Sequence, residues 1–323
     1  MSSNAKGALL ALIAFGVFAT HDTIVKVLGA IYAPFQIVFF GVLFSFPLAT
    51  VMLMRDAKPG TLLPVHPWWM ALRTVAAVCT GVSAFYAFST LPLAQTYAIL
   101  FASPLLITIL AIPVLGEKVR LRRWIAVLFG LAGVVIVLRP GATPLTLGHA
   151  AAVLAAIGGA VASIVVRKIG AEERPVVILL YPMVVNFALM ACVLPFVYVP
   201  MPIGDLGLVA VVAIFGWIAN RLLIVAYNNG EAAIIAPMQY SQIIWASLFG
   251  MLFFSETIDR FTLLGAGVII GSGLYIVLRE SRAGASENTP VLRTRSRSET
   301  GTTPRVSLFM RIAGKAPPRG PNA

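Results

Sequence analysis

The chain has 323 residues, of which 59% are hydrophobic and only 11% are charged, with 24 basic and 12 acidic side chains. A soluble domain has about 25% charged residues, so this chain carries too few charges to cover two globular surfaces. The composition favours a lipid-embedded protein and argues against a nucleic-acid-binding protein, despite the net charge of +12.

Apolar stretches long enough to cross a bilayer recur along the whole chain. A hydrocarbon core of about 30 Å requires about 20 apolar residues in a helix. The first stretch lacks a small-residue cleavage site, so we interpret it as a retained helix rather than a removed signal peptide. The sequence predicts ten spans, at residues 7–28, 34–54, 68–89, 94–115, 121–138, 147–166, 176–198, 206–227, 232–254 and 261–278.

Basic residues in the short loops predict the orientation, because cytoplasmic loops are enriched in Lys and Arg. Ten basic loop residues fall on one side of the membrane, and two, Arg139 and Arg260, fall on the other. We therefore expect a multi-pass protein of the cell inner membrane with both termini in the cytoplasm. The ten residues on the cytoplasmic side are Lys6, Arg55, Lys58, Lys118, Arg120, Arg122, Arg123, Arg167, Lys168 and Arg174.

The first span contains three ionisable residues, His21, Asp22 and Lys26. Such groups are costly inside a membrane and mark transport pathways or internal pairs. Asp22 and Lys26 lie four residues apart on one helix face, so they either neutralise each other or contact a substrate. His21 either couples protons to transport or is a hydrogen-bonded core histidine.

The fourth and ninth spans each combine a mid-helix proline with amides, hydroxyls and aromatic rings. Proline frees a carbonyl that another helix, a water or a ligand must satisfy. Amides beside flat rings suit a planar polar organic molecule, and hydrogen bonding between packed spans is the structural alternative. The candidate binding residues in these two spans are Gln95, Tyr97, Ser103, Gln239, Tyr240, Gln242 and Trp245.

The eighth span adds Asn220 and Arg221 close to Trp217. Arg221 either lines a cavity or extends its guanidinium to the lipid headgroups. Arg73 in the third span has the same two interpretations.

The sequence resembles itself at a period of about 140 residues. Ala14 to Lys26 is echoed by Ala156 to Lys168, and the turn at Glu117 is echoed at Glu256. Five spans in each half is an odd number, so the second copy must enter the bilayer from the opposite side. We expect an all-α membrane protein with ten transmembrane helices in two inverted five-helix repeats. The repeats occupy 1–140 and 147–279, and a disordered basic cytoplasmic tail occupies 280–323.

Several catalytic motifs are missing from the sequence. It has no Gly-x4-Gly-Lys-Ser/Thr loop, no His-x-x-x-His pair, no carboxylate cluster and no nucleophile elbow. We therefore expect no ATP hydrolysis, no catalytic residue, no metal site and no cofactor. A membrane-embedded enzyme is an alternative that rests only on His21 and Asp22, and a duplicated structural subunit is another.

The turn Leu115-Gly116-Glu117-Lys118 after the fourth span, its counterpart at Ser255-Glu256, and the five-plus-five duplication resemble the EamA family of the drug/metabolite transporter superfamily. The likeness covers about residues 7–280. It implies a secondary carrier whose central cavity is lined largely by the first, third, fourth, sixth, eighth and ninth helices. Gly41 stands where many members carry an arginine.

Four segments, at residues 20–26, 34–40, 95–104 and 237–245, look like those of the riboflavin transporters of proteobacteria. S-adenosylmethionine uptake carriers are more distant kin. The resemblance implies import of a small organic metabolite by alternating access, with riboflavin as the first candidate. Its flavin ring would stack on Tyr97, Tyr240 or Trp245, and its hydroxyls would bond Gln95, Gln239, Gln242 and Asn220.

Other substrates and directions are open at this stage. An exporter or importer of amino acids, S-adenosylmethionine or drugs would have the same fold. The expected partners are a small-molecule substrate and the lipid bilayer. Small residues in the fifth and tenth spans permit a homodimer but do not require one.

Overall fold

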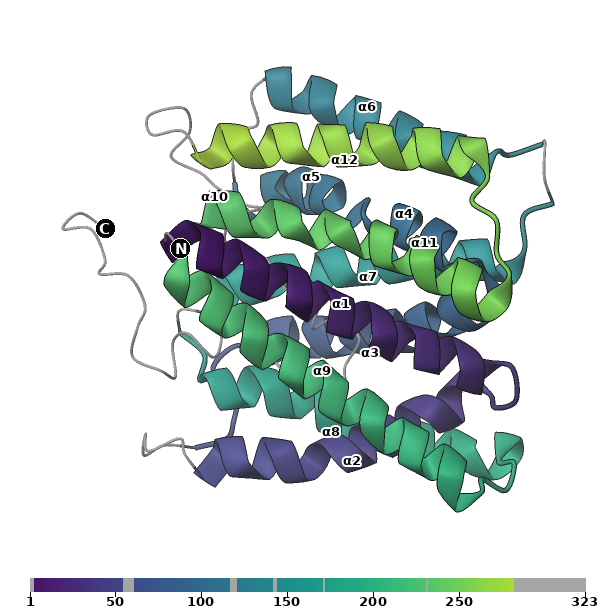
Figure 1. The fold of residues 1–323 in the computed structure, drawn as a ribbon. Helices are drawn as coiled ribbons and strands as arrows, with labels where there is room; N and C mark the ends of the chain where they lie inside the picture. The colour runs from purple at the N-terminus through teal and green to yellow at the C-terminus, as the bar shows by residue number, and fades with distance from the viewer. Residues whose placement is uncertain are drawn as a thin grey trace.

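The computed structural model describes residues 3–54, 61–116, 121–141, 144–170, 172–230 and 232–281. Within these ranges the chain forms twelve α-helices and one 3-10 helix, η1, and no strand (Figure 1). The predicted all-α class is confirmed. Of the predicted tail at 280–323, residues 282–323 lie outside the described part of the chain.

The helices coincide with the ten predicted segments, with ends that differ by no more than four residues. The first half contains α1 (Ser3–Gly29), α2 (Pro34–Met54), α3 (Pro67–Thr90), α4 (Leu93–Leu100), α5 (Ser103–Leu115) and α6 (Leu121–Leu138). The second half contains α7 (Leu147–Ile169), α8 (Pro175–Val197), α9 (Ile203–Asn229), α10 (Ala232–Ile235), η1 (Ala236–Tyr240), α11 (Ser241–Phe254) and α12 (Arg260–Ser281).

Two predicted spans are broken rather than continuous. The fourth is divided into α4 and α5 just before Pro104, and the ninth passes from α10 through η1, which contains Pro237, into α11. Proline has no N–H and its ring clashes with the preceding turn, so it interrupts the helical hydrogen bonds. Both breaks are buried, because Phe101 and Ala236 are inaccessible or nearly so. The backbone groups freed there lie inside the bundle.

Among the described residues, seven helical segments are long and apolar enough to cross a membrane. The apolar stretches of α6 and α12, Arg123–Leu138 and Arg260–Ile276, are shorter than these seven segments. The ninth predicted span is divided at η1. Large apolar side chains project outward from the bundle, including Phe129, Phe196 and Leu252. So much exposed apolar surface fits contact with lipid rather than with water. The chain is a multi-pass membrane protein.

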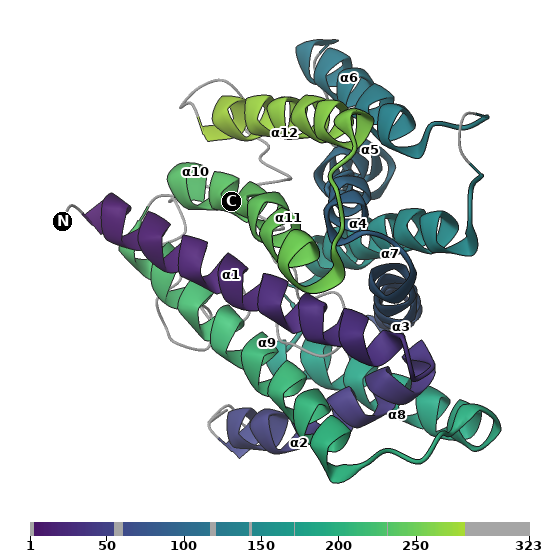
Figure 2. The same cartoon turned by 45° about the vertical axis from the view of Figure 1, so that its right-hand side comes forward.

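The helices pack in two groups that correspond under exchange of the two halves. In the α1 group, α1 packs along α9 and α11; in the α3 group, α7 packs along α3 and α5 (Figures 1 and 2). Since α7, α3 and α5 are the counterparts of α1, α9 and α11, each group repeats the contacts of the other. The pairs α2–α8 and α4–α11 join corresponding helices across the molecule.

The helices α6 and α12 form a pair at one edge of the bundle (Figures 1 and 2). A Cβ atom on Gly265 would lie 2.6 Å from the Gly133 carbonyl oxygen, so only glycine allows this approach. The glycine-rich tenth span therefore packs against the fifth span of the same chain.

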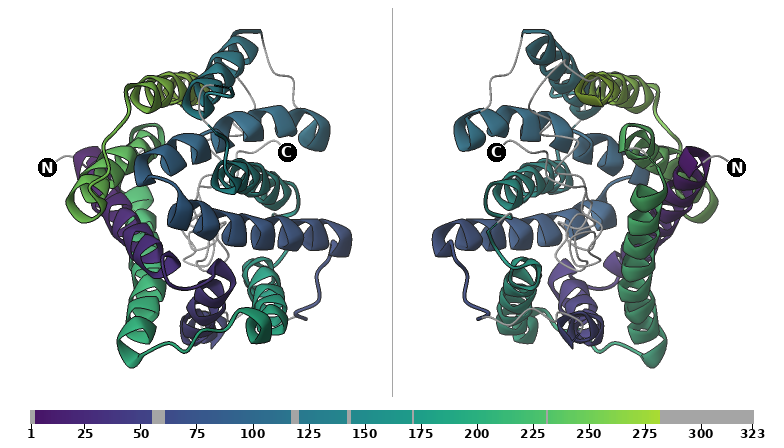
Figure 3. Two further views of the ribbon diagram at one scale, coloured as in Figure 1. Left: turned by 90° about the vertical axis from the view of Figure 1, so that its right-hand side faces the viewer. Right: turned by 90° about the vertical axis from the view of Figure 1, so that its left-hand side faces the viewer.

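In a view turned by 90° from that of Figure 1, the α1 group lies on one side of the molecule and the α3 group lies toward the other (Figure 3). One end of the bundle carries the N-terminus. We call the opposite end, formed by residues 30–33, 91–92, 198–202 and 255–259, the distal end.

Candidate functional site

Three of the predicted site residues meet between α1 and α4. The Nδ1 atom of His21 lies 2.8 Å from a carboxylate oxygen of Asp22, and the Tyr97 hydroxyl donates to the other oxygen. Asp22 and Tyr97 are each 1% exposed and His21 is 3% exposed. Phe85 packs edge-on against the imidazole and Phe88 against the phenol. We call His21, Asp22 and Tyr97 the Asp22 cluster.

Lys26 pairs with a residue from the other half of the chain. Its Nζ atom lies 2.7 Å from Glu256 Oε1 and donates to the Leu91 carbonyl. The second Glu256 oxygen accepts the Leu93 N–H at 3.0 Å. Lys26 therefore pairs with Glu256, whereas the carboxylate of Asp22 binds His21 and Tyr97. Lys26 and Glu256 together bind the backbone on both sides of Pro92, and we call this segment the α3–α4 corner.

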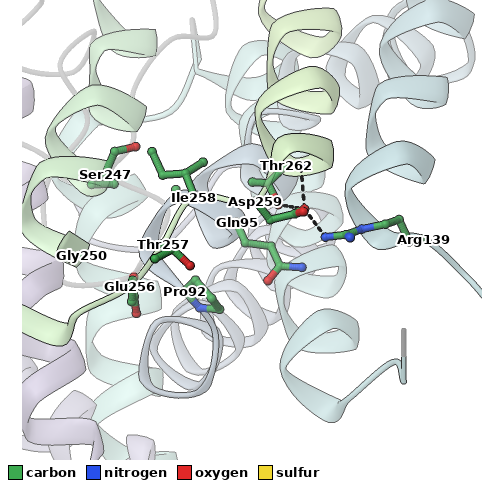
Figure 4. A pocket seen from close by; sticks show the side chains of 12 residues that line it. Pro92, Gln95, Arg139, Ser247, Gly250, Glu256, Thr257, Ile258, Asp259 and Thr262 are labelled. Atoms are coloured by element: carbon green, nitrogen blue, oxygen red, sulfur yellow. Dashed lines mark hydrogen bonds and ion pairs between the residues drawn. The ribbon is translucent and has the colours of Figure 1, made fainter. Parts of the chain in front are cut away.

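A small pocket lies beside this ion pair at the distal end, between α4, α11 and the start of α12 (Figure 4). Its volume of about 70 Å³ is room for only a few water molecules. Gln95 points into it from α4, and its Nε2 atom lies 3.1 Å from His149 Nε2. On the other wall Arg139 donates to Asp259, so the pocket is framed by contacts between the two halves.

Two amides on the α1 group carry buried polar atoms without hydrogen-bond partners in the described part of the chain. Asn220 donates to the Gly216 carbonyl at 2.8 Å, but its Oδ1 atom is unpartnered, as is Gln242 Nε2. A buried polar atom without a partner costs about 1–3 kcal/mol, so these positions suit a bound ligand or water. Both residues were predicted site residues.

Sequence reasoning missed two further buried polar residues of the same kind. Asn186 on α8 is 0% exposed, and neither atom of its amide has a partner among the described residues. Thr74 on α3 likewise has a buried, unpartnered hydroxyl. The signal that singled out Asn220, an amide in the middle of a predicted span, was equally present at Asn186.

The predicted aromatic residues lie in two different surroundings. Tyr240 packs edge-on against Phe101, which also contacts Tyr97, so both tyrosines belong to a buried group of rings. Trp245 is half-buried on α11, where its indole faces Gly16 of α1: a Cβ atom on that glycine would lie 3.2 Å from the ring. Gln239 is also half-buried, in η1.

Ser103 and Arg221 make contacts with residues outside the Asp22 cluster. The Ser103 hydroxyl donates to the Ala156 carbonyl at 3.3 Å and joins α5 to α7. Arg221 is exposed, and its guanidinium lies 5.5 Å from the centre of the Trp217 ring on the same helix. An exposed guanidinium over an indole fits the headgroup interpretation of Arg221 better than the cavity interpretation.

Comparison with known proteins gives two consecutive matches to the family described as "EamA-like transporter family", at residues 5–139 and 146–278. The two matched ranges agree with the repeat seen in the sequence and in the helix contacts.

Individual relatives are similar at comparable levels. The chain is 27% identical to an S-adenosylmethionine uptake transporter of Rickettsia bellii, over 82% of this chain and 91% of that protein. It is 28% identical to a riboflavin transporter of Rhizobium johnstonii, over 75% and 79%. It is 27% identical to the pseudopaline exporter CntI of Pseudomonas aeruginosa, over 82% and 93%. A solved crystal structure at 20% identity, with a TM-score of 0.55, covers 85% of this chain and 97% of that chain and has the same fold.

Proposed function

Because this chain belongs to the EamA-like transporter family, we propose that it is a secondary transporter that carries a small organic metabolite across the cell inner membrane. The proposed mechanism is alternating access, in which the α1 group and the α3 group move relative to each other without ATP hydrolysis. Two groups with equivalent contacts support this mechanism, because they can exchange conformations to open one end and then the other.

The proposal includes a topology of ten membrane-spanning helical segments in two inverted halves. Each half has five segments, so successive crossings leave the second half in the opposite orientation. The divided segments α4–α5 and α10–η1–α11 are counterparts, and broken helices of this kind are common at transporter binding sites. The distribution of Lys and Arg favours cytoplasmic termini, and in the proposed topology the distal end then faces the outer side of the membrane.

Riboflavin is the proposed substrate, and import is the proposed direction. The observation that carries this proposal is the pairing of Gln242 with Trp245 on one face of α11. The Gln242 Nε2 atom is buried without a partner in the described part of the chain, and the indole three residues later is half-buried. A flavin ring offers carbonyl acceptors for the amide and a flat face for the indole. An aromatic pair of this kind contributes about 0.5–1.5 kcal/mol.

S-adenosylmethionine is the second candidate, because a relative named for its uptake is as similar to this chain as the riboflavin transporter is. Its adenine ring would use the same Gln242–Trp245 face. Its sulfonium charge would require a nearby acidic group, which riboflavin would not.

The test is substrate exchange by the purified protein in proteoliposomes, with radiolabelled riboflavin and radiolabelled S-adenosylmethionine in separate assays. Trp245→Ala is compared with Trp68→Ala, since Trp68 is 86% exposed. We expect riboflavin exchange by the wild type and by Trp68→Ala, and a loss of about tenfold or more in Trp245→Ala. Normal exchange by Trp245→Ala would remove this residue from the site. Exchange of S-adenosylmethionine alone would reassign the substrate, and exchange of neither would contradict the proposed function.

A further inference from the structure

The carboxylate of Asp22 lies in an unusual position for a charged group. It is almost fully buried among the rings of α1, α3 and α4, and an imidazole and a phenol both bind it. All three side chains can bind or release a proton. A buried carboxylate inside a membrane protein is costly, so its presence calls for a function.

The second half of the chain provides an internal comparison. The repeat aligns Gly16 with Gly158 and Lys26 with Lys168, which places Ile164 opposite Asp22 and Ser163 opposite His21. Ile164 and Ser163 are buried to the same extent as their counterparts. The fold therefore accepts an apolar side chain at this position. Packing alone does not explain the carboxylate, and only the first half carries an acid–imidazole pair here.

The Asp22 cluster also joins the two groups of helices. Asp22 lies on α1, and Tyr97 lies on α4, where its ring packs on Phe88 of α3, so the hydrogen bond between them ties the α1 group to a helix that packs on the α3 group. One turn further along α1, Lys26 and Glu256 bind the α3–α4 corner at the distal end. Opening of the distal end would require both connections to break.

We propose that the Asp22 cluster binds the proton that drives transport, and that binding of this proton releases the distal end. The inference rests on the proposed transporter function. Ionised Asp22 accepts the hydrogen bond of Tyr97 and holds the two groups together. A proton that enters from the distal side binds the Asp22 carboxylate, where His21 shares it. The neutral acid is a weaker acceptor, because charge-assisted hydrogen bonds are about twice as strong as neutral ones. Tyr97 is then free to separate, and the proton leaves toward the opposite side after the groups have moved.

Other charged groups on the elements around α1 have different surroundings. Glu256 pairs with Lys26, and Asp205 on α9 accepts from Tyr32. Arg221 is exposed on α9. Arg73 lies near the start of α3, whereas Phe85, which contacts His21, lies near the end of that helix. The buried phenol nearest to the cluster through ring contacts is Tyr240, which packs on Phe101. These placements leave Asp22 and His21 as the titrating pair between the two groups.

The experiment measures the opening of the distal end directly, without any substrate. Spin labels are attached to Thr90→Cys, at the end of α3, and Thr257→Cys, after α11, both at exposed positions. The two native cysteines are replaced by serine beforehand, since both are exposed. Distance distributions are recorded in lipid nanodiscs at about pH 5 and about pH 8, on either side of the range in which an ordinary imidazole titrates.

We expect the wild type to show a several-fold larger fraction of long distances at low pH. Asp22→Asn, which imitates the protonated acid, should show the low-pH distribution at both pH values. Asp205→Asn is the matched control, because it removes another distal carboxylate, and it should keep the wild-type pH response. A wild type without a pH response, or an Asp22→Asn variant with the wild-type response, would overturn the proposal.

Tyr97→Phe covers the case in which Asp22→Asn does not fold. It removes the donor but leaves the acid, so the long distances should dominate at both pH values; a wild-type response in Tyr97→Phe would also overturn the proposal. Riboflavin exchange is measured on the same samples. Failure of exchange with an intact pH response would count against the substrate alone, whereas loss of the response with intact exchange would count against the proton site alone.

Discussion

The Nζ atom of Lys26 on α1 and the Oε1 atom of Glu256, two residues beyond α11, lie 2.7 Å apart. The two side chains are only 12% and 17% exposed, so the ion pair is largely shielded from solvent. Each partner also bonds the backbone of the α3–α4 corner, through the Leu91 carbonyl and the Leu93 N–H. A contact between residues far apart in sequence thereby fixes how the two groups meet at the distal end.

Removal of one partner of this pair should destabilise the protein more than removal of both. Lys26→Met leaves the Glu256 carboxylate without its cation, and we expect a loss of about 1.5–3 kcal/mol in the free energy of unfolding. The double variant Lys26→Met/Glu256→Gln should recover part of that loss, because no unpaired charge is left. The measurement is thermal unfolding in detergent, with the two single variants and the double variant treated as one cycle. Additive losses in the cycle would mean that the two side chains do not interact.

Two glycines on α12 provide a matched pair for the position of Tyr240. A Cβ atom on Gly273 would lie 1.9 Å from the Tyr240 hydroxyl oxygen, whereas a Cβ atom on Gly271 would meet nothing within 4 Å. Gly273→Ala should therefore displace the buried phenol and cost about 1–3 kcal/mol. Gly271→Ala should be neutral or slightly stabilising, because alanine favours the helix.

Unfolding temperatures of the two variants check this prediction, and riboflavin exchange gives a second readout. If Tyr240 contributes to the binding site, Gly273→Ala should also weaken exchange, and Gly271→Ala should not. Equal stability of both variants would show that α12 and η1 are not packed as closely as the structure has them.

Sequence periodicity and composition were sufficient for the positions of the helices. Apolar runs of about 20 residues predicted α2 and α6 with their bounds, and prolines in the fourth and ninth spans marked where those helices break. These features are local, so the residues that determine them are neighbours in the chain. The repeat of about 140 residues was likewise visible in the sequence and is matched by the exchange of helix contacts between the halves.

Side-chain partners were less predictable, because they depend on helix packing. Spacing on one helix suggested that Asp22 and Lys26 face each other, but α4 presents a phenol to Asp22 and the turn after α11 presents a carboxylate to Lys26. Nothing in the local sequence specifies such contacts. Asn186 is a different case, because its place in the middle of a predicted span is the same signal that pointed to Asn220.

Gln36 on α2 holds the connection between α8 and α9. Its amide is 0% exposed, donates to the Val199 carbonyl at 2.7 Å and accepts the Val199 N–H at 2.9 Å. Gln36→Leu keeps the approximate volume but leaves two backbone groups without partners, so we expect a loss of about 1–3 kcal/mol. Thr50→Ala on the same helix is the control, because Thr50 is exposed and bonds only its own helix. Similar unfolding temperatures for the two variants would show that the Val199 backbone groups find other partners.

Tyr32, in the turn between α1 and α2, gives a prediction for high pH. Its hydroxyl donates to Asp205 at 2.5 Å, and this hydrogen bond is the main cause that raises the pKa of Tyr32 from 10.0 to about 12. The folded protein therefore holds this proton more tightly than the unfolded chain does. The contribution of this hydrogen bond to stability is therefore complete below pH 10 and is lost as the pH rises through about 12.

Titration of phenolate absorbance should locate this group. Tyr32→Phe should remove one phenolate that forms near pH 12, and the rest of the curve should be unchanged. Asp205→Asn removes the carboxylate that accepts the bond, so the pKa of Tyr32 should fall back toward its ordinary value of 10.0. The stability difference between wild type and Tyr32→Phe should be constant from neutral pH to about pH 10 and should shrink above it. If Asp205→Asn instead left the phenolate curve unchanged, the raised pKa would have another cause, and the hydrogen bond between α9 and the α1–α2 turn would contribute little to the distal end.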